Sequence, residues 1–210
     1  QIFISNEESQ PQLLHKLIST TTGIKLNEIP DKINDPQYTY SNIYNSQDNF
    51  LLFTQSSWEE LRTQILWLIK DKGIKIFYID KIQGLYSDER IKDRKQELGF
   101  IIRELKKIAV QNQLTFFISS SLSTSVEQRE GKHPYLCDIK ESDALEEFSD
   151  IIMLLHRPEI YGITEDENGN SLMNYSELFV RKNKNGAIGE LKFTFNNRIP
   201  RFEEFKGYSK

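Results

Sequence analysis

The sequence has a single cysteine, Cys137, no long apolar run and no excess of positive charge. One cysteine excludes an internal disulfide and fits the reducing cytoplasm, where we expect the protein to work. No stretch approaches the ~18–20 apolar residues that a membrane-spanning helix needs. No signal-peptide pattern opens the chain either. We therefore expect no membrane partner.

Charge and missing motifs narrow the chemistry further. The chain has 27 Lys and Arg against 31 Asp and Glu, a formal net charge of −4, so only local basic clusters could bind nucleic acid. No cluster of Cys and His predicts a zinc site, and we expect neither His15 nor His156 to bind a metal. The phosphate-binding motif G-x-x-x-x-G-K-[ST] is absent, since the only Gly-Lys pair is Gly131-Lys132.

Apolar and helical stretches alternate along the 210 residues, which suffice for one sizeable α/β domain. Strands are predicted at residues 1–4, 50–53, 74–80, 114–119 and 151–155. Helices are predicted after the caps Ser9 and Ser57, around residues 26–33 and over residues 98–109. Residues 175–181 and 190–195 predict an antiparallel pair, and residues 164–170 a flexible insert. This alternation predicts a mostly parallel sheet with helices on both faces and a C-terminal antiparallel hairpin.

Polar residues follow three of the predicted parallel strands. Glu7 and Glu8 follow the first, Asp80 ends the third, and residues 119–121 end the fourth. Ligands gather at such strand ends, where one carboxylate can hold Mg²⁺ and another can activate water. The apolar run before Asp80 matches the Walker B pattern, although an Asp that merely caps a turn looks the same. Glu7 could equally complement the positive end of the following helix.

Five segments keep a common order and spacing: residues 4–9, 79–83, 120–129, 136–146 and 181–186. They resemble the motifs Ser-Leu-Glu-Met-Ser, Asp-Tyr-Leu-Gln, Ser-Gln-Leu-Ser-Arg-Ser-Val-Glu-Gln-Arg, Leu-Ser-Asp-Leu-Arg-Glu-Ser-Gly-Ala-Ile-Glu and Ala-Lys-Gln-Arg-Asn-Gly. These motifs belong to the C-terminal ATPase domain of DnaB-type replicative DNA helicases. The resemblance runs from residue 2 to about residue 204.

The resemblance implies a RecA-like ATPase core in which residues 1–210 form a single domain, and we expect this domain to be truncated at its N-terminus before the first strand. It further implies an ATP- and Mg²⁺-dependent DNA helicase that works as a ring of identical subunits on single-stranded DNA, with primase or a helicase loader as further partners. Glu7 falls on the family's catalytic glutamate and Asp80 on its Mg²⁺-binding aspartate. Lys182 and Lys184 fall in the motif that acts on the neighbouring subunit's ATP. Ser121 stands at the position of a glutamine that contacts the nucleotide in the family.

Two basic clusters correspond to the family's DNA-contacting loops. Basic loops track the phosphate backbone without reading sequence. Interleaved acidic residues at positions 88, 89 and 93 leave open that the first cluster is only a solvated helix start. The DNA-binding candidates are Arg90, Lys92 and Arg94 in the first cluster, Arg129 and Lys132 in the second, and Lys140 shortly after it.

The chain departs from the family at several motif positions. The phosphate-binding loop, which in the family lies upstream of the strand at residues 1–4, is absent, so we expect these residues alone to be inactive. Lys184 replaces the arginine finger and lacks its planar fork. Thr124 and Lys140 also replace arginines. A second interpretation therefore stays open, in which the domain is a catalytically degenerate scaffold that binds a replication partner. A third, another type of RecA-like ATPase, is disfavoured by residues 125–129.

Overall fold

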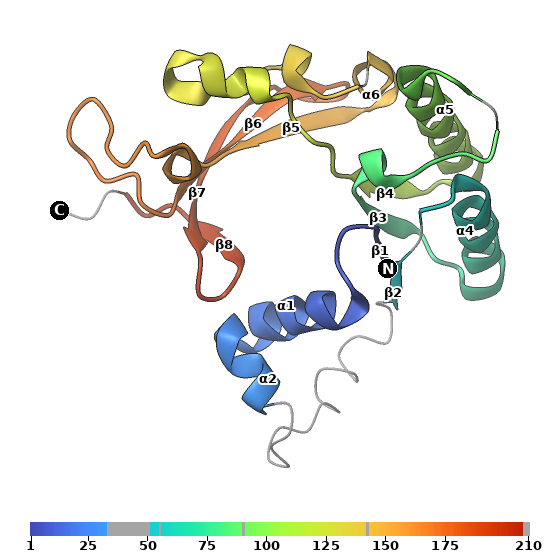
Figure 1. Ribbon diagram of the computed structural model, residues 1–210, viewed down its shortest axis with the longest axis horizontal. Helices are drawn as coiled ribbons and strands as arrows, with labels where there is room; N and C mark the ends of the chain where they lie inside the picture. Colours follow the sequence, from blue (N-terminus) through green and yellow to red (C-terminus); the bar gives the residue numbers. More distant parts are fainter. Residues whose placement is uncertain (33–50, 55, 90, 142, 208–210) are drawn as a thin grey trace.

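The structure, a computed structural model, describes residues 1–32, 51–54, 56–89, 91–141 and 143–207. Its strands form two four-stranded sheets, with the orders β2-β1-β3-β4 and β5-β6-β7-β8. Figure 1 shows the first sheet beside α4 and α5, and the second sheet as the long orange and red ribbons. The α/β class is as predicted, with more antiparallel structure than a single terminal hairpin provides.

The first sheet is parallel throughout, and its strands confirm the first four predictions to within two residues. Its central strands are β1 and β3, whose nearly continuous apolar sequences suit a sheet interior. Ser5 pairs with Asp80, so these two strands end together at one edge of the sheet. The strands are β1 (Ile2–Ser5), β2 (Leu51–Thr54), β3 (Ile76–Asp80) and β4 (Thr115–Ile118).

One face of this sheet carries the main core. Ile4 and Ile79 are paired neighbours, each 1% exposed, and they belong to one cluster with the buried side chains of α4 and α5. The other face carries an aromatic row, in which Phe3 stacks on Tyr78 with ring centroids 6.1 Å apart and Tyr78 stacks on Phe117 at 4.9 Å. Phe117 remains 45% exposed, so this face is covered less completely than predicted.

The two core helices begin at residues whose side chains accept backbone hydrogen bonds. α4 (Trp58–Lys72) follows Ser57, whose hydroxyl oxygen accepts from the backbone N–H of Glu60 at 3.4 Å. α5 (Arg94–Asn112) follows Asp93, whose carboxylate accepts from the N–H groups of residues 95 and 96 at 2.7 and 3.1 Å. Apolar residues at helical spacing face the sheet from α5: Leu98, Ile101, Ile102, Leu105 and Ile108.

A smaller unit follows β1. α1 (Gln10–Thr22) begins after the predicted cap Ser9, whose backbone N–H donates to the side chain of Gln12 at 2.9 Å. It ends at Gly23, whose φ of 77° lies in the left-handed region that glycine tolerates. η1 (Leu26–Glu28) and α2 (Ile29–Lys32) then confirm the short helix predicted there, as far as the described residues reach.

The second sheet corrects the prediction for the fifth strand. β5 (Ile151–His156) pairs antiparallel with β6 (Tyr175–Asn183) and does not continue the parallel sheet. The side chains of β5 alternate between exposed and buried. Ile152 is buried, whereas Ile151 and Met153 are 53% and 48% exposed. An apolar run of this length cannot show whether one face or both are buried. β7 (Gly189–Asn196) confirms the predicted hairpin, and β8 (Arg201–Glu204) is a strand that we did not predict.

Short helices occupy the connections between these elements. The predicted flexible insert at residues 164–170 contains a hydrogen-bonded turn, in which the Asp166 carboxylate accepts from the backbone N–H groups of Asn168 at 2.9 Å and Asn170 at 2.8 Å. Within the described ranges, no helix is long and apolar enough to cross a bilayer. The short helices are η2 (Ile82–Gly84), η3 (Thr124–Gln128), η4 (Glu130–Lys132), η5 (Leu136–Asp138), α6 (Asp143–Phe148) and η6 (Pro158–Tyr161).

Candidate active site and basic loops

Glu7 and Asp80 lie at the same edge of the parallel sheet. Asp80 is the last residue of β3 and pairs with Ser5, the last residue of β1. The buried hydroxyl oxygen of Ser5 accepts hydrogen bonds from the backbone N–H groups of Glu7 at 3.3 Å and Glu8 at 3.1 Å. These bonds hold the turn after β1, which places the exposed Glu7 side chain at the sheet edge.

The side chain of Asn6 ties this turn to the segment after β3. Its Nδ2 donates to the Lys81 carbonyl at 2.9 Å, and its Oδ1 accepts from the Lys81 backbone N–H at 3.1 Å. The Asp80–Lys81 peptide bond is cis. A Cβ atom added at Gly84 would lie 2.0 Å from Asn6 Oδ1, so the close packing of these two loops requires glycine there.

The two carboxylates have different partners. Glu7 Oε1 lies 2.5 Å from Lys81 Nζ, and the Glu7 side chain is 44% exposed. Asp80 Oδ1 accepts a hydrogen bond from the Ser119 hydroxyl at 2.5 Å, which joins the ends of β3 and β4. Carboxylate oxygens are the ligands that Mg²⁺ prefers, and a carboxylate can also orient a water molecule. This edge of the sheet therefore carries the carboxylate oxygens that both predicted roles require, namely Mg²⁺ binding and activation of water.

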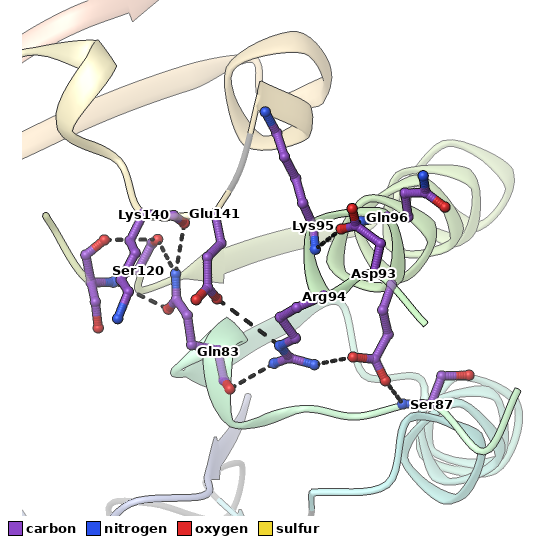
Figure 2. A network of polar contacts seen from close by, with 11 residues as sticks. Gln83, Ser87, Asp93, Arg94, Lys95, Gln96, Ser120, Lys140 and Glu141 are labelled. Atoms are coloured by element: carbon purple, nitrogen blue, oxygen red, sulfur yellow. Dashed lines mark hydrogen bonds and ion pairs between the residues drawn. The ribbon is translucent and has the colours of Figure 1, made fainter. Parts of the chain in front are cut away.

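Ser121 and Lys140 meet at a clamp formed by Gln83. Gln83 Oε1 accepts from the Ser121 backbone N–H at 3.1 Å, and its Nε2 donates to the Ser120 hydroxyl at 2.7 Å and to the Lys140 carbonyl at 3.2 Å (Figure 2). The Lys140 backbone N–H in turn donates to the Ser121 carbonyl at 3.0 Å. The amide of Gln83 thus couples the segment after β3 to the loop after β4.

Figure 2 shows that Arg94 belongs to the same network. Its guanidinium donates to the Gln83 carbonyl at 2.7 Å and pairs with Glu97, and its Nε lies 4.0 Å from Glu141 Oε2. Glu97, which is 9% exposed, also accepts from the Ser87 backbone N–H at 2.7 Å. These partners give Arg94 an intramolecular role that the charge pattern does not reveal.

The other candidates of the first basic cluster differ from Arg94. Arg90 lies outside the described residues. Lys92 is exposed, and so is Lys140 beyond the Gln83 clamp. Within the part of the chain that the structure describes, neither lysine ammonium forms an ion pair. Lys92 and Lys140 are therefore available to bind an anion.

The loop after β4 is held closed by Arg129. Its guanidinium donates to both carboxylate oxygens of the buried Asp138, at 2.7 and 2.6 Å, and to the His133 carbonyl at 3.0 Å. These bonds to Arg129 lower the pKa of the Asp138 carboxyl from its usual 3.8. Lys132 Nζ donates to the Glu127 carbonyl at 2.5 Å. Both basic residues thus help to shape the loop in which they were predicted to bind DNA.

Lys182 and Lys184 lie on the second sheet, at the end of β6 and just beyond it. Lys182 Nζ donates to the carbonyls of Glu146 and Glu147 in the last turn of α6, where a cation is favourable. Lys184 Nζ lies 3.1 Å from Asp150 Oδ1, and Lys106 holds the other carboxylate oxygen. A hydrogen bond from Lys106, and to a lesser extent one from Lys184, lowers the pKa of the Asp150 carboxyl.

One group of polar residues was not predicted from the sequence, and it includes His156, at which we expected no metal. His133, His156 and Glu177 each offer a ligand atom, and these three atoms lie within 4.8 Å of one another. Burial, and then the charge of His133, lowers the pKa of His156 to about 4. The residues are more than 20 positions apart, so no short spacing could have revealed them. Only the antiparallel pairing of β5 with β6 places His156 opposite Glu177.

The sequence and the fold of the chain resemble those of known helicase domains. A model of the DnaB-like helicase C-terminal domain family matches residues 1–204. The replicative DNA helicase DnaC of Bacillus subtilis is 35% identical over 144 residues, which are 68% of this chain and 31% of that protein. DnaB of Buchnera aphidicola subsp. Baizongia pistaciae is 27% identical over 212 residues, which are 97% of this chain and 45% of that protein. The chain spans less than half of these relatives.

Two solved structures share the fold at 26% identity with a TM-score of 0.79, each over 98% of this chain. One is a DnaB-like replicative helicase, described with its interactions with primase, of which the match covers 50%. The other is an ATPase domain, of which it covers 74%. From the match over residues 1–204 and these structural neighbours, the chain belongs to the DnaB-like helicase C-terminal domain family, with a RecA-like ATPase fold.

Proposed function

We propose that this domain is the motor of a hexameric replicative DNA helicase, which hydrolyses ATP between subunits and moves along single-stranded DNA. The observation that carries the proposal is the position of Glu7 and Asp80 at the carboxyl ends of two adjacent parallel strands, in a chain of this family. The edge combines an exposed carboxylate with a second one that a neighbouring strand holds in place.

The residues at this edge fit Mg²⁺ and ATP. Asp80 would hold the metal ion with its carboxylate, which Ser119 orients. Mg²⁺, when bound with ATP, supplies positive charge against the phosphate oxygens. Glu7 would accept a hydrogen bond from the attacking water, and Lys81 keeps the Glu7 carboxylate at the sheet edge until it does. Ser121 is held on its backbone by Gln83 and would face the nucleotide from the end of β4.

A second subunit would complete the site. Glu7 and Asp80 lie at the carboxyl ends of strands in the first sheet, whereas Lys182 and Lys184 lie at the C-terminal end of β6 in the second sheet, beside α6 and Asp150. A head-to-tail contact between identical subunits brings different surfaces together and can close into a ring. Lys184, exposed beyond β6, would then contact the neighbour's phosphates. Lys182, which caps α6, would position the hairpin that carries Lys184.

DNA would contact the loops after β3 and β4. The exposed ammonium groups of Lys92 and Lys140 are the most direct candidates for phosphate contacts. Arg94 and Arg129 would act chiefly by holding these loops in shape, through the Gln83 network and the Asp138 pair. Because Gln83 links both loops, movement at one strand end would be transmitted to the other. Primase or a helicase loader would be further partners of the assembled protein.

The alternative is a catalytically degenerate scaffold that binds a replication partner. Two substitutions within the chain favour it, because Ser121 stands where the family has a glutamine and Thr124 where it has an arginine. Lys184 in place of an arginine points the same way.

The deciding experiment measures ATP hydrolysis by the product of the complete gene, with and without single-stranded DNA, beside Glu7→Gln. DNA-stimulated turnover that falls by at least a hundredfold in the variant supports the motor. Glu8→Gln is the matched control, since Glu8 pairs with Lys16 within its own segment, and it should retain turnover. A folded protein that shows no turnover with Mg²⁺ present would reject the motor in favour of the scaffold.

A further inference from the structure

His133, His156 and Glu177 converge from three separate segments of the chain. His156 is the last residue of β5, and Glu177 stands directly opposite it on β6. Paired residues of an antiparallel ladder project to the same face, so their side chains are neighbours. His133 reaches them from the loop between η4 and η5, and its ring centroid lies 4.7 Å from that of His156.

The spacing of the three side chains suits a small metal ion. His133 Nε2 lies 3.4 Å from Glu177 Oε2. Ligand atoms on a tetrahedral ion with bonds of ~2.0–2.1 Å are about 3.3 Å apart. All three ligand atoms lie within 4.8 Å of one another, so they would have to close by at most about 1.5 Å. His133, with 47% of its side chain exposed on a loop, has room to make that movement.

The surroundings hold two of the ligands in place. His156 is only 2% exposed, and its Nδ1 atom is buried without a hydrogen-bond partner among the described residues. Buried polar atoms nearly always have a partner, so this nitrogen is open to one. Tyr161 stacks on the His156 ring at 5.7 Å. The Tyr175 hydroxyl donates to Glu177 Oε1 at 2.9 Å and so orients the carboxylate, as outer contacts do at metal sites.

We propose that His133, His156 and Glu177 bind one divalent transition-metal ion of the Zn²⁺ type, with a fourth position open to water. Two imidazoles and one carboxylate favour such an ion over Mg²⁺ or Ca²⁺, which prefer oxygen ligands. The ion would fasten the loop of Arg129 and Lys132 to the second sheet, because His133 belongs to that loop. The site is distinct from the proposed ATP site and does not depend on the proposed function.

The test titrates the metal-free chain with Zn²⁺ by calorimetry and with Co²⁺ by visible absorption, without nucleotide. We expect one ion per chain and intense Co²⁺ bands of a four-coordinate site. His133→Gln and Glu177→Gln should each weaken binding at least tenfold, with circular dichroism showing that both variants are folded. Variants at the exposed ligand His133 avoid the risk of unfolding that a change at buried His156 carries.

Three controls make the result specific. His15→Gln removes the only other histidine, Cys137→Ser removes the only thiol, and Asp80→Asn disables the proposed Mg²⁺ site. Each should bind Zn²⁺ with the affinity of the unsubstituted chain. The proposal is overturned by any of three results: no binding, unchanged binding in His133→Gln and Glu177→Gln, or loss of the site in Cys137→Ser.

Discussion

Arg129 and Asp138 form a bidentate pair that closes the loop after β4 upon itself. The two guanidinium nitrogens lie 2.7 and 2.6 Å from the two carboxylate oxygens. Asp138 is 1% exposed, and it also accepts the backbone N–H of Tyr135 at 2.7 Å. The Arg129 guanidinium further packs over the Tyr135 ring, 4.7 Å from its centroid. Arg129, which was predicted to bind DNA, therefore also holds its own loop in shape.

Asp138→Asn should lower the free energy of unfolding by about 1–3 kcal/mol at pH 7, because a buried acceptor of charged hydrogen bonds loses its charge. Urea denaturation measures the change. Asp71→Asn, at an exposed position on α4, is the matched control and should have little effect. Equal stability of the two variants would show that the pair contributes nothing.

The same pair predicts a pH dependence. Arg129 holds the pKa of Asp138 below its usual 3.8 in the folded state, so the unfolded chain takes up this proton first as the pH falls. The stabilisation is complete above pH 3.8 and is lost as the pH falls through the folded-state pKa. The stability difference between the unsubstituted chain and Asp138→Asn should therefore shrink below pH 3.8, and urea denaturation at pH 7 and at pH 3 measures it.

Gly84→Ala should destabilise the protein by about 1–3 kcal/mol, because overpacking forces neighbours to move and the added Cβ meets Asn6 Oδ1 at 2.0 Å. Thermal or urea unfolding measures the loss. Gly189→Ala is the control, since no atom lies within 4 Å of its added Cβ. In a double-mutant cycle, Asn6→Ala should remove most of the penalty at Gly84. Additive effects of the two substitutions would mean that the side chains at positions 6 and 84 do not interact.

Lys92→Ala and Lys140→Ala should each weaken single-stranded DNA binding at every sequence and reduce the salt dependence of binding by about 0.7 of a counterion. The measurement is fluorescence anisotropy of a labelled oligonucleotide at several salt concentrations. Lys70→Ala, at an exposed position near the end of α4, is the matched control. An unchanged salt slope in both loop variants would place the DNA elsewhere.

We expect Lys182 to have a structural role and Lys184 a catalytic one. Lys182→Ala removes a cation from the C-terminus of α6 and should cost about 0.3–1 kcal/mol of stability. Lys184→Ala breaks an exposed ion pair and should cost less, while lowering ATP hydrolysis at least tenfold. Mixing Glu7→Gln with Lys184→Ala subunits should restore part of the activity if the lysine acts across the interface. No recovery in the mixture would place Lys184 outside the neighbour's site.

Elements with strong local signals could be predicted from sequence. Ser57 and Gly73 bound α4 as expected, because a side-chain cap and a left-handed glycine are encoded by single residues. The continuous apolar run ending in Asp80 indicated a central parallel strand, and the edge shared with Glu7 follows from strand order. The family could likewise be recognised from motifs that keep their order and spacing, although single residues within them are substituted.

Features that depend on distant partners appear only in the folded chain. β5 looks like a parallel strand by composition, yet its neighbour is β6, and this pairing brings His156 against Glu177. Arg94 and Arg129 look like DNA contacts by charge, yet Gln83, Glu97 and Asp138 are close enough to engage them. Local propensity selects a helix or a strand from a few neighbouring residues. Which side chains meet depends on how all the elements bury their apolar faces together, and only the tertiary structure decides that.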